Sequence, residues 1–436
     1  MEKIKSLSKT QKLAWLLTLL PIICLVGLLY LKTVNVPFWD EWELVPIFQH
    51  LHAGHFWWSD FWMQHNEHRL LFPNLILVGL AYVTRWNVRI ESFISVLVAI
   101  LSFGILLRLL VTMGHKSKQA IPLFLPLLLA VIWFSPVQIE NWQWGWQLEW
   151  FLNILGVTLV AYAISKLKNS SLSYKALSLI LAGGILAQYS LGNGTLIWPI
   201  VVALLIYLRL PLKQILTVAV TGVVTTFLYY WHYTNPGEPS KSLFLKQPFQ
   251  FVKYFFIYLG RPLSFMHKTT ALLGLLLFVS FISLSIYLLV YKRDAFKRVV
   301  PFVFLGLYAL GSAFITDLAR LGFGTVEAYS SRYTTISSLL LISVLVLFWA
   351  SADELKFLKH RRYLYTTAAL VVSLLVCVNV AWGVHSASEQ YQKLTTTKAC
   401  THLTQPTTSC LLTAYPNAQI VSGRLEYIKS IHWGGY

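Results

Sequence analysis

Charged side chains are scarce in this sequence of 436 residues. Only 12% of its residues are Asp, Glu, Lys or Arg, whereas 56% are hydrophobic, and about 25% charged residues is usual for soluble domains. This composition excludes a soluble enzyme, a disordered chain and a fibrous protein. It predicts an all-α polytopic membrane protein, because long apolar segments cross a bilayer as helices.

Several motifs and residue types are also missing. The sequence has no G-x-x-x-x-G-K-[ST] loop, no G-x-G-x-x-G turn and no Asp-x-Asp pair, and it has no large soluble segment that could bind a nucleotide sugar. Four cysteines are too few for a disulfide scaffold. Acidic residues number 17 against 35 Lys and Arg, a net charge of +18. In a membrane protein this excess indicates basic cytoplasmic loops and not a nucleic-acid partner.

Apolar runs of spanning length, about 17–25 residues, predict nine long transmembrane helices near 13–31, 91–113, 119–137, 148–165, 214–232, 269–291, 299–319, 333–351 and 363–385. Two shorter runs, 176–191 and 194–208, are separated by the turn LGNGT and are expected to form a helical pair. The run 70–83 contains Pro73 and Asn74 and is short for a span. We expect it to be interfacial or re-entrant, which gives about 11 spans in total.

The distribution of basic residues predicts the orientation. With a cytoplasmic N-terminus and no crossing by 70–83, the inside segments hold 20 of the 35 basic residues; these segments are 1–12, 108–118, 166–175, 209–213, 292–298 and 356–362. A crossing at 70–83 would reverse this asymmetry. We therefore expect N-in and C-out topology, with a transmembrane domain over 1–387, a first outside loop over 32–90 and a small extracytoplasmic tail over 388–436.

Acids and tryptophans gather on the predicted outer side. The first outside loop contains Asp40, Glu41, Glu43, Asp60 and Glu67, and its Trp-rich pieces near 41–52 and 56–64 predict interfacial helices. A second outside segment, 140–150, alternates Trp with Glu, Asn and Gln. Flat aromatic rings beside carboxylates and amides suit a sugar-binding surface. Plain alternatives are an interfacial aromatic layer and acids that cap helices, such as Asp40 as an N-cap.

Three further patterns indicate candidate binding sites. Outside arginines near membrane level, with Arg261 and Arg332 as the leading pair, could hold a phosphate through their guanidinium forks. The segment HLHAGH (His50, His52 and His55) could bind zinc by spacing alone, and a carboxylate-bound Mg²⁺ or Mn²⁺ is another alternative. Cys400 and Cys410 are the only cysteines outside the predicted spans, so we expect a disulfide between them in an oxidising compartment.

The sequence resembles the GT-C fold of integral-membrane glycosyltransferases. The resemblance rests on the order of PFWDEWE (37–43) after the first span, LLFPNLILVGLAYV (70–83) before the second, an acidic outside segment after the third, and SRY (331–333) at the start of a late span. It implies a polyprenyl-phosphate-linked sugar donor and an active site on the extracytoplasmic face. It also implies that an acid of the first outside loop is the catalytic base, and Asp40 matches this position best, followed by Glu41.

These observations together predict a glycosyltransferase of the bacterial plasma membrane with its active site facing outside. Its acceptor would be a hydroxyl of a cell-wall polymer, a lipid-linked glycan or a protein. The expected substrate-binding residues are Glu67, His68, Arg69, Glu140, Trp142, Gln143 and Gln147, and the expected donor-phosphate ligands are Arg261, Arg320 and Arg332. The alternatives are a transporter or flippase of a lipid-linked substrate, and another outer-face lipid-handling transferase or polymerase.

Overall fold

A computed structural model describes residues 15–117, 121–168, 170–234, 243–266, 268–351 and 361–436. The described chain is almost entirely helical, as predicted. Its only sheet is a hairpin of two strands with two residues each. Within these residues, nine helices are long and apolar enough to span a membrane: Trp15–Lys32, Val88–Lys116, Phe124–Gln143, Gly145–Ser165, Leu212–Tyr230, Thr270–Tyr291, Arg293–Phe323, Ser331–Ser351 and Thr366–Thr401. They coincide with the nine long apolar runs of the sequence.

The elements of the first half follow the expected order. They are α2 (Leu19–Lys32), η2 (Trp39–Leu44), α3 (Val45–His52), α4 (Trp58–Trp62), β1 (Gln64–His65), β2 (His68–Arg69), α5 (Leu71–Thr84), α6 (Val88–Ser117), α7 (Phe124–Trp133), η3 (Pro136–Gln138), α8 (Ile139–Gln143), η4 (Gly145–Gln147), α9 (Leu148–Ser165), α10 (Tyr174–Gln188), η5 (Gly192–Leu196) and α11 (Ile197–Tyr207). The expected pair at 176–191 and 194–208 is therefore present as α10 and α11, both shorter than the nine long helices.

The second half contains most of the remaining long helices. Its elements are α12 (Leu212–Tyr230), α13 (Leu243–Lys246), α14 (Pro248–Gly260), α15 (Thr270–Tyr291), α16 (Arg293–Arg320), η6 (Leu321–Phe323), η7 (Glu327–Tyr329), η8 (Ser331–Tyr333), α17 (Thr334–Ser351), α18 (Arg361–Thr401), α19 (Thr408–Ala414) and α20 (Ala418–Ser430). The sequence predicted no helix between the spans near 214–232 and 269–291, where α14 forms. This helix packs closely on α15, since a Cβ atom at Gly260 would lie 1.9 Å from the carbonyl oxygen of Thr270.

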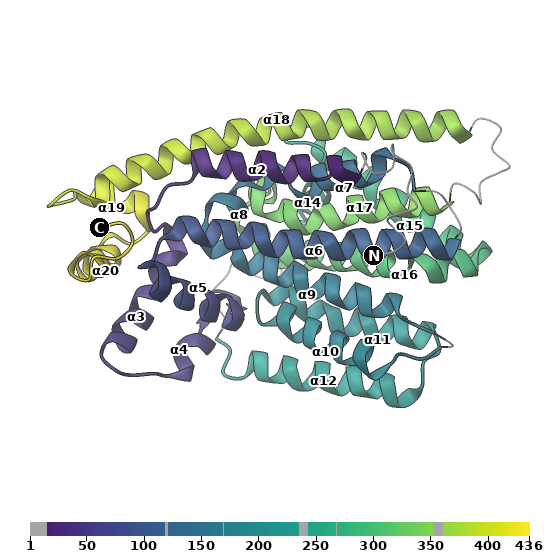
Figure 1. Ribbon diagram of the computed structural model, residues 1–436, viewed down its shortest axis with the longest axis horizontal. Coiled ribbons are helices and arrows are strands. Elements are labelled where there is room, and N and C mark those ends of the chain that lie inside the picture. The colour runs from purple at the N-terminus through teal and green to yellow at the C-terminus, as the bar shows by residue number, and fades with distance from the viewer. Residues whose placement is uncertain (1–14, 118–120, 169, 235–242, 267, 352–360) are drawn as a thin grey trace.

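Long helices run along the long axis of the molecule, and the short helices α3, α4, α5, α19 and α20 gather at one end of them (Figure 1). We call this end the loop end. Helix α5 begins and finishes there: Phe72 N donates to Tyr189 O at its start, and Trp86, just after its last turn, packs against Phe48 at a ring distance of 5.1 Å. Both ends of the segment 70–83 therefore contact elements of the loop end, and its interfacial or re-entrant placement in a membrane stays a prediction, as does the total of about 11 spans.

The C-terminal tail packs against the first loop instead of hanging free. Helix α18 continues through residue 387 without a break, so the tail begins inside a helix. Cys400 and Cys410 are joined in a disulfide with Cα atoms 5.7 Å apart. The Arg424 guanidinium binds the Glu43 carboxylate through two contacts, Nη1–Oε1 at 2.9 Å and Nη2–Oε2 at 3.0 Å. The tail and the first outside loop thus form one packed layer over the loop end.

Candidate active-site cavity

A cavity of about 360 Å³ opens at the loop end of the bundle. Its walls come from η2, the β1–β2 hairpin, η4, the start of α9, η5, the end of α12 and the residues that follow it, the last turns of α16, and η8. Carboxylates and arginines share the lining, namely Asp40, Glu67, Glu149, Arg320 and Arg332. Segments that are far apart in the sequence therefore bring charges of both signs into one small space.

Asp40 lies in the cavity beside a histidine. Its Oδ2 is 3.5 Å from His65 Nε2, and its side chain is 26% exposed. The N-cap of η2 is Phe38 and not Asp40, so the capping role considered for Asp40 is not observed. Trp39 directly before it has a left-handed φ of 51°, a conformation that costs a bulky residue free energy and that clusters at functional sites. Asp40 is thus positioned by strained backbone at the edge of a cavity.

Glu41 performs the capping role instead. Its carboxylate is buried and accepts hydrogen bonds from Phe38 N at 2.7 Å and Trp146 N at 3.4 Å. Burial raises the pKa of Glu41 to about 8 and the Asp40 charge adds to this rise, while hydrogen bonds from Phe38, Trp146 and Gly145 oppose it. Glu41 is not among the cavity-lining residues. Its geometry favours a structural role over that of a base in contact with substrate.

Two of the three expected phosphate ligands line the cavity. Arg320 Nη2 lies 2.6 Å from Glu67 Oε2, and Arg332 Nη2 lies 2.8 Å from Glu327 Oε1. Both arginine side chains stay partly exposed, at 25% and 30%. Arg261 is elsewhere: it is buried, its Nη1 donates to Ser264 O, and it is absent from the lining. The cations that face the cavity are therefore Arg320 and Arg332.

His68 anchors a turn that the sequence did not mark as part of a site. Gly192 N donates to His68 Nδ1 at 3.3 Å. Burial lowers the pKa of His68 to about 4; Glu67 opposes the shift and Arg320 contributes to it. The imidazole is therefore neutral at pH 7 and can accept this bond. It holds the turn 191–195, whose Asn193 and Thr195 line the cavity. In the sequence, the signal that could have marked this turn as part of a site is its position, since LGNGT is a polar stretch between two apolar runs.

Four expected substrate ligands are used inside the fold and do not line the cavity. The Arg69 guanidinium donates to three carbonyls, of Trp62, Tyr229 and Trp231. Trp142 is fully buried and stacks on Phe151. Gln143 donates to Lys32 O and Ala387 O, and Glu140 Oε2 accepts from Ser330 Oγ, Ser331 Oγ and Arg332 N. Glu140 consequently fixes the loop that carries Arg332, which is a positioning role.

The segment 146–150, which follows Gln143 in the chain, reaches the cavity. Gln147 lines it together with Trp146, Glu149 and Trp150. Within the described part of the chain, Gln147 Oε1 is buried without a hydrogen-bond partner. A buried amide oxygen that lacks a partner costs free energy unless a ligand or water satisfies it. Gln147 is therefore the expected substrate ligand whose surroundings best fit that role.

The predicted metal alternatives find little geometric support. His50 Nδ1 pairs with Asp60 Oδ2 at 2.9 Å, and His52 Nδ1 with the Tyr427 hydroxyl at 2.5 Å, so the HLHAGH histidines serve separate contacts. No group of three His, Cys, Asp or Glu side chains with metal-site geometry occurs in the described ranges. A Mg²⁺ or Mn²⁺ ion would need substrate phosphates in addition to Asp40 or Glu67, as is common for Mg²⁺.

Comparison with known proteins does not assign the chain to a family. No family model matches the sequence, and no significantly similar curated protein is found. The likeness to GT-C enzymes therefore stays a resemblance of motif order. Function has to be argued from the chemistry of the cavity, because a fold alone supports many activities.

Proposed function

We propose that this protein is a membrane glycosyltransferase that moves a sugar from a polyprenyl-phosphate donor to an acceptor hydroxyl within the loop-end cavity. The observation that carries the proposal is the combination, in one cavity of about 360 Å³, of a carboxylate beside a histidine (Asp40 and His65) with two partly exposed arginines (Arg320 and Arg332). A base and a phosphate-binding cation pair are the two elements that such a transfer requires.

The reaction can be written with every atom placed. Asp40 accepts the proton of the acceptor hydroxyl while the acceptor oxygen bonds to the anomeric carbon of the sugar. The bond between that carbon and the donor phosphate oxygen breaks, and the lipid phosphate departs with the electron pair. Arg320 and Arg332 stabilise the negative charge that grows on the phosphate. His65 orients Asp40 and can take up its proton after transfer.

The remaining lining suits a sugar. Trp146 and Trp150 offer aromatic faces, and the amides of Asn66, Gln147 and Asn193 offer donors and acceptors for hydroxyls. The cavity volume lies within the range of about 300–1,000 Å³ that is typical of small-ligand sites. We extend the proposal to a bacterial plasma membrane with the cavity outside, and to an acceptor that is a cell-wall polymer, a lipid-linked glycan or a protein.

A transporter or flippase is the second candidate, because three carboxylates are buried in spanning helices. Glu91, Glu149 and Asp317 are at most 6% exposed, and intramembrane acids are typical of ion-coupled transport. All three lie near the loop end: Glu91 and Glu149 are in the first turn of α6 and α9, and Asp317 is in the last turn of α16. Acids confined to one end suit a surface reaction better than a path through the membrane. An outer-face lipid-handling transferase or polymerase would use the same cavity.

The lipid that accumulates in cells lacking this protein tests the proposal. We expect mass spectrometry of lipid extracts to show a polyprenyl-phosphate-linked sugar that disappears when the parent protein is restored. An impermeant oxidant of sugar diols, applied to intact cells, should destroy this lipid if transfer has failed on the outer face. A protected lipid would favour the flippase, and an unchanged polyprenyl-linked pool would refute both functions.

A further inference from the structure

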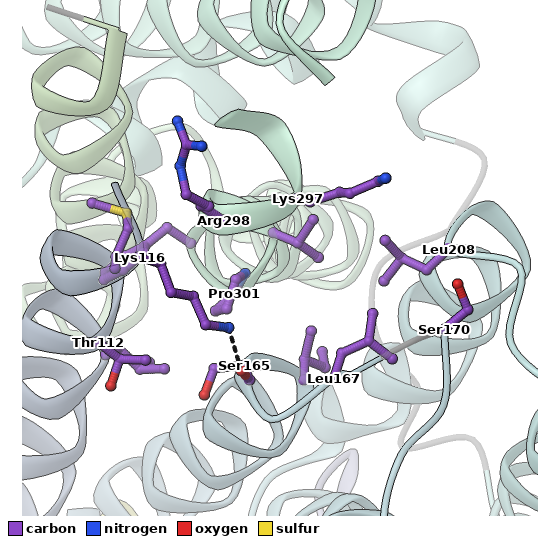
Figure 2. A pocket seen from close by; sticks show the side chains of 14 residues that line it. Thr112, Lys116, Ser165, Leu167, Ser170, Leu208, Lys297, Arg298 and Pro301 are labelled. Carbon is purple, nitrogen blue, oxygen red and sulfur yellow. Dashed lines mark hydrogen bonds between the residues drawn. The ribbon is translucent and has the colours of Figure 1, made fainter. Parts of the chain in front are cut away.

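A second cavity, of about 300 Å³, lies at the opposite end of the bundle, which we call the basic end. Its walls are the last turns of α6, the connection between α9 and α10, the residue after α11, and the first turns of α16 (Figure 2). The charge asymmetry of the sequence assigns this end to the cytoplasm. The proposed glycosyl transfer does not involve this cavity. An inference about the cavity is therefore independent of the proposed function.

Every charged residue that the structure describes in the lining of this cavity is basic. Lys116 comes from α6, and Lys297 and Arg298 come from one turn of α16 and diverge from each other (Figure 2). Lys166 and Lys168 lie in the connection after α9, beside Ser165 and Leu167 of the lining. Among the described residues at this end, the acid close to the cavity is Asp294, whose Oδ1 is 3.9 Å from Lys297 Nζ and whose side chain is 91% exposed. Cations from two separate helices thus line the same cavity.

Lys116 is held at the cavity wall by a specific contact. Its Nζ donates to Ser165 O at 3.0 Å (Figure 2). An ammonium has three donors, so this bond fixes the group while two N–H bonds stay available for an anion. A lysine that merely extends into water at a helix end would not need this anchor. The Ser170 hydroxyl adds a neutral polar group to the same lining. The hydroxyls of Thr112 and Ser165 donate to the carbonyls of Arg108 and Tyr162.

The floor of the cavity is apolar and buried. It consists of Leu109, Met113, Ile164, Leu208, Val300 and Phe302. Lys116 is the last residue of a spanning helix, and Lys297 and Arg298 lie near the start of another. The cations therefore stand at the level where lipid headgroups meet the hydrocarbon region, with an apolar surface beneath them.

We propose that this cavity binds the phosphate headgroup of an anionic membrane phospholipid. The phosphate would sit among Lys116, Lys297 and Arg298, and an acyl chain would contact the apolar floor. Basic pockets between spanning helices on the cytoplasmic side are suited to such lipids, and each Lys or Arg near an anionic headgroup contributes to binding. A free phosphate offers the same charge but gains nothing from the floor.

Native mass spectrometry of the purified full-length protein in detergent can test the site with phosphatidylglycerol as the probe and phosphatidylcholine as the neutral comparison. The test variant is Lys116→Gln with Lys297→Gln. The matched control is Lys175→Gln with Lys213→Gln, which removes the same charge from the same end outside this cavity. We expect phosphatidylglycerol affinity to fall about 25-fold in the test variant, roughly fivefold for each lysine, and much less in the control.

Three outcomes would overturn the proposal. Equal loss in both double variants would mean that the basic end attracts anionic lipid only through its general charge. Undiminished binding in the test variant would place the lipid elsewhere. Displacement of phosphatidylglycerol by an equal concentration of inorganic phosphate would assign the site to a soluble anion. Matching elution profiles for the parent and both variants establish that a loss of binding is not a loss of fold.

Discussion

The two ends of this bundle differ in the charges that they bring together. At the loop end, three carboxylates, two arginines and a set of Trp, Tyr and amide side chains share one cavity. At the basic end, three cations share a cavity with hydroxyls and apolar side chains, and none of the described residues that line it is a carboxylate. Groups of opposite charge in one space can move a proton and stabilise a leaving group, whereas cations alone can only hold an anion.

The difference also shows how a chain with few charges uses them. Apolar helices fill the distance between the two ends, so polar side chains concentrate where the helices finish. Glu91, Glu149 and Asp317 follow this rule although they lie inside spanning helices. The comparison predicts that substitutions at the loop end alter transfer and that substitutions at the basic end alter lipid binding.

The largest expected effect is that of Asp40→Asn. Asn keeps the shape of the side chain but cannot take a proton, and loss of a general base typically lowers the rate by about 10²–10⁴-fold. The measurement is clearance of the accumulated lipid-linked sugar in cells that lack the parent protein. Asp60→Asn is the matched control, because Asp60 lies in the same loop but pairs with His50 away from the cavity. Parental turnover by Asp40→Asn would transfer the role of base to Glu67 or Glu149.

The next largest expected effect on the transfer rate is that of Arg320→Ala. Removal of one group that stabilises transition-state charge costs about 10²–10³-fold in rate, so Arg320→Ala should lose that much. Arg320→Lys should lose less, since it keeps the charge but not the bidentate fork. Arg261→Lys provides the comparison, because its guanidinium donates to Ser264 O outside the cavity. The same assay decides, and equal losses at positions 320 and 261 would contradict the assignment.

Because Glu41 is buried and caps η2, we expect its titration to change the stability of the fold with pH and not the rate of transfer. Burial raises its pKa from the ordinary 4.5 to about 8. Between these values the folded protein keeps a proton that the unfolded chain releases, so its contribution to stability falls as pH rises from about 4.5 to about 8. Glu41→Gln should remove this part of the slope. The fall in melting temperature between pH 5 and pH 8 should therefore be smaller in the variant than in the parent, by about 2 °C or more. Thermal unfolding at pH 5, 6.5 and 8 measures it; identical slopes would count against a buried, protonated Glu41.

The disulfide should give the smallest effect. The Cys400–Cys410 bond closes a loop of about ten residues, so its removal by a double Cys→Ser substitution should cost roughly 2–3 kcal/mol at most, confined to the tail. We expect faster proteolysis of the tail with the rest of the chain intact. Mass spectrometry of protein isolated without reductant should find no free thiol at these two positions, and two free thiols would refute the bond.

Hydropathy sufficed to predict the nine long helices, since these depend on local composition. Helix α14 was missed because it is short and follows a polar segment, and its close packing on α15 at Gly260 is a tertiary contact that local composition does not reveal. The docking of the tail was missed for a similar reason, because the contact between Glu43 and Arg424 joins residues that are distant in the chain.

For the candidate site as well, some features could be predicted from the sequence and others could not. Six residues that were selected by type and by position near the outer ends of the spans line one cavity: Asp40, Glu67, His68, Gln147, Arg320 and Arg332. Their roles in binding and catalysis stay predictions. The same reasoning could not distinguish Glu41, which caps η2, or Arg69, which binds three backbone carbonyls. A polar side chain can serve the fold or a ligand, and only its three-dimensional neighbours decide which.

The most direct test of the account is the side of the membrane on which each end lies. Single cysteines at Asp294, at the basic end, and at Gln419, in the tail, would both be exposed to water. With an impermeant thiol reagent on intact cells, we predict labelling at 419 and none at 294 until the cells are opened. Labelling at 294 in intact cells would place the basic end outside and contradict the proposed outward-facing active site.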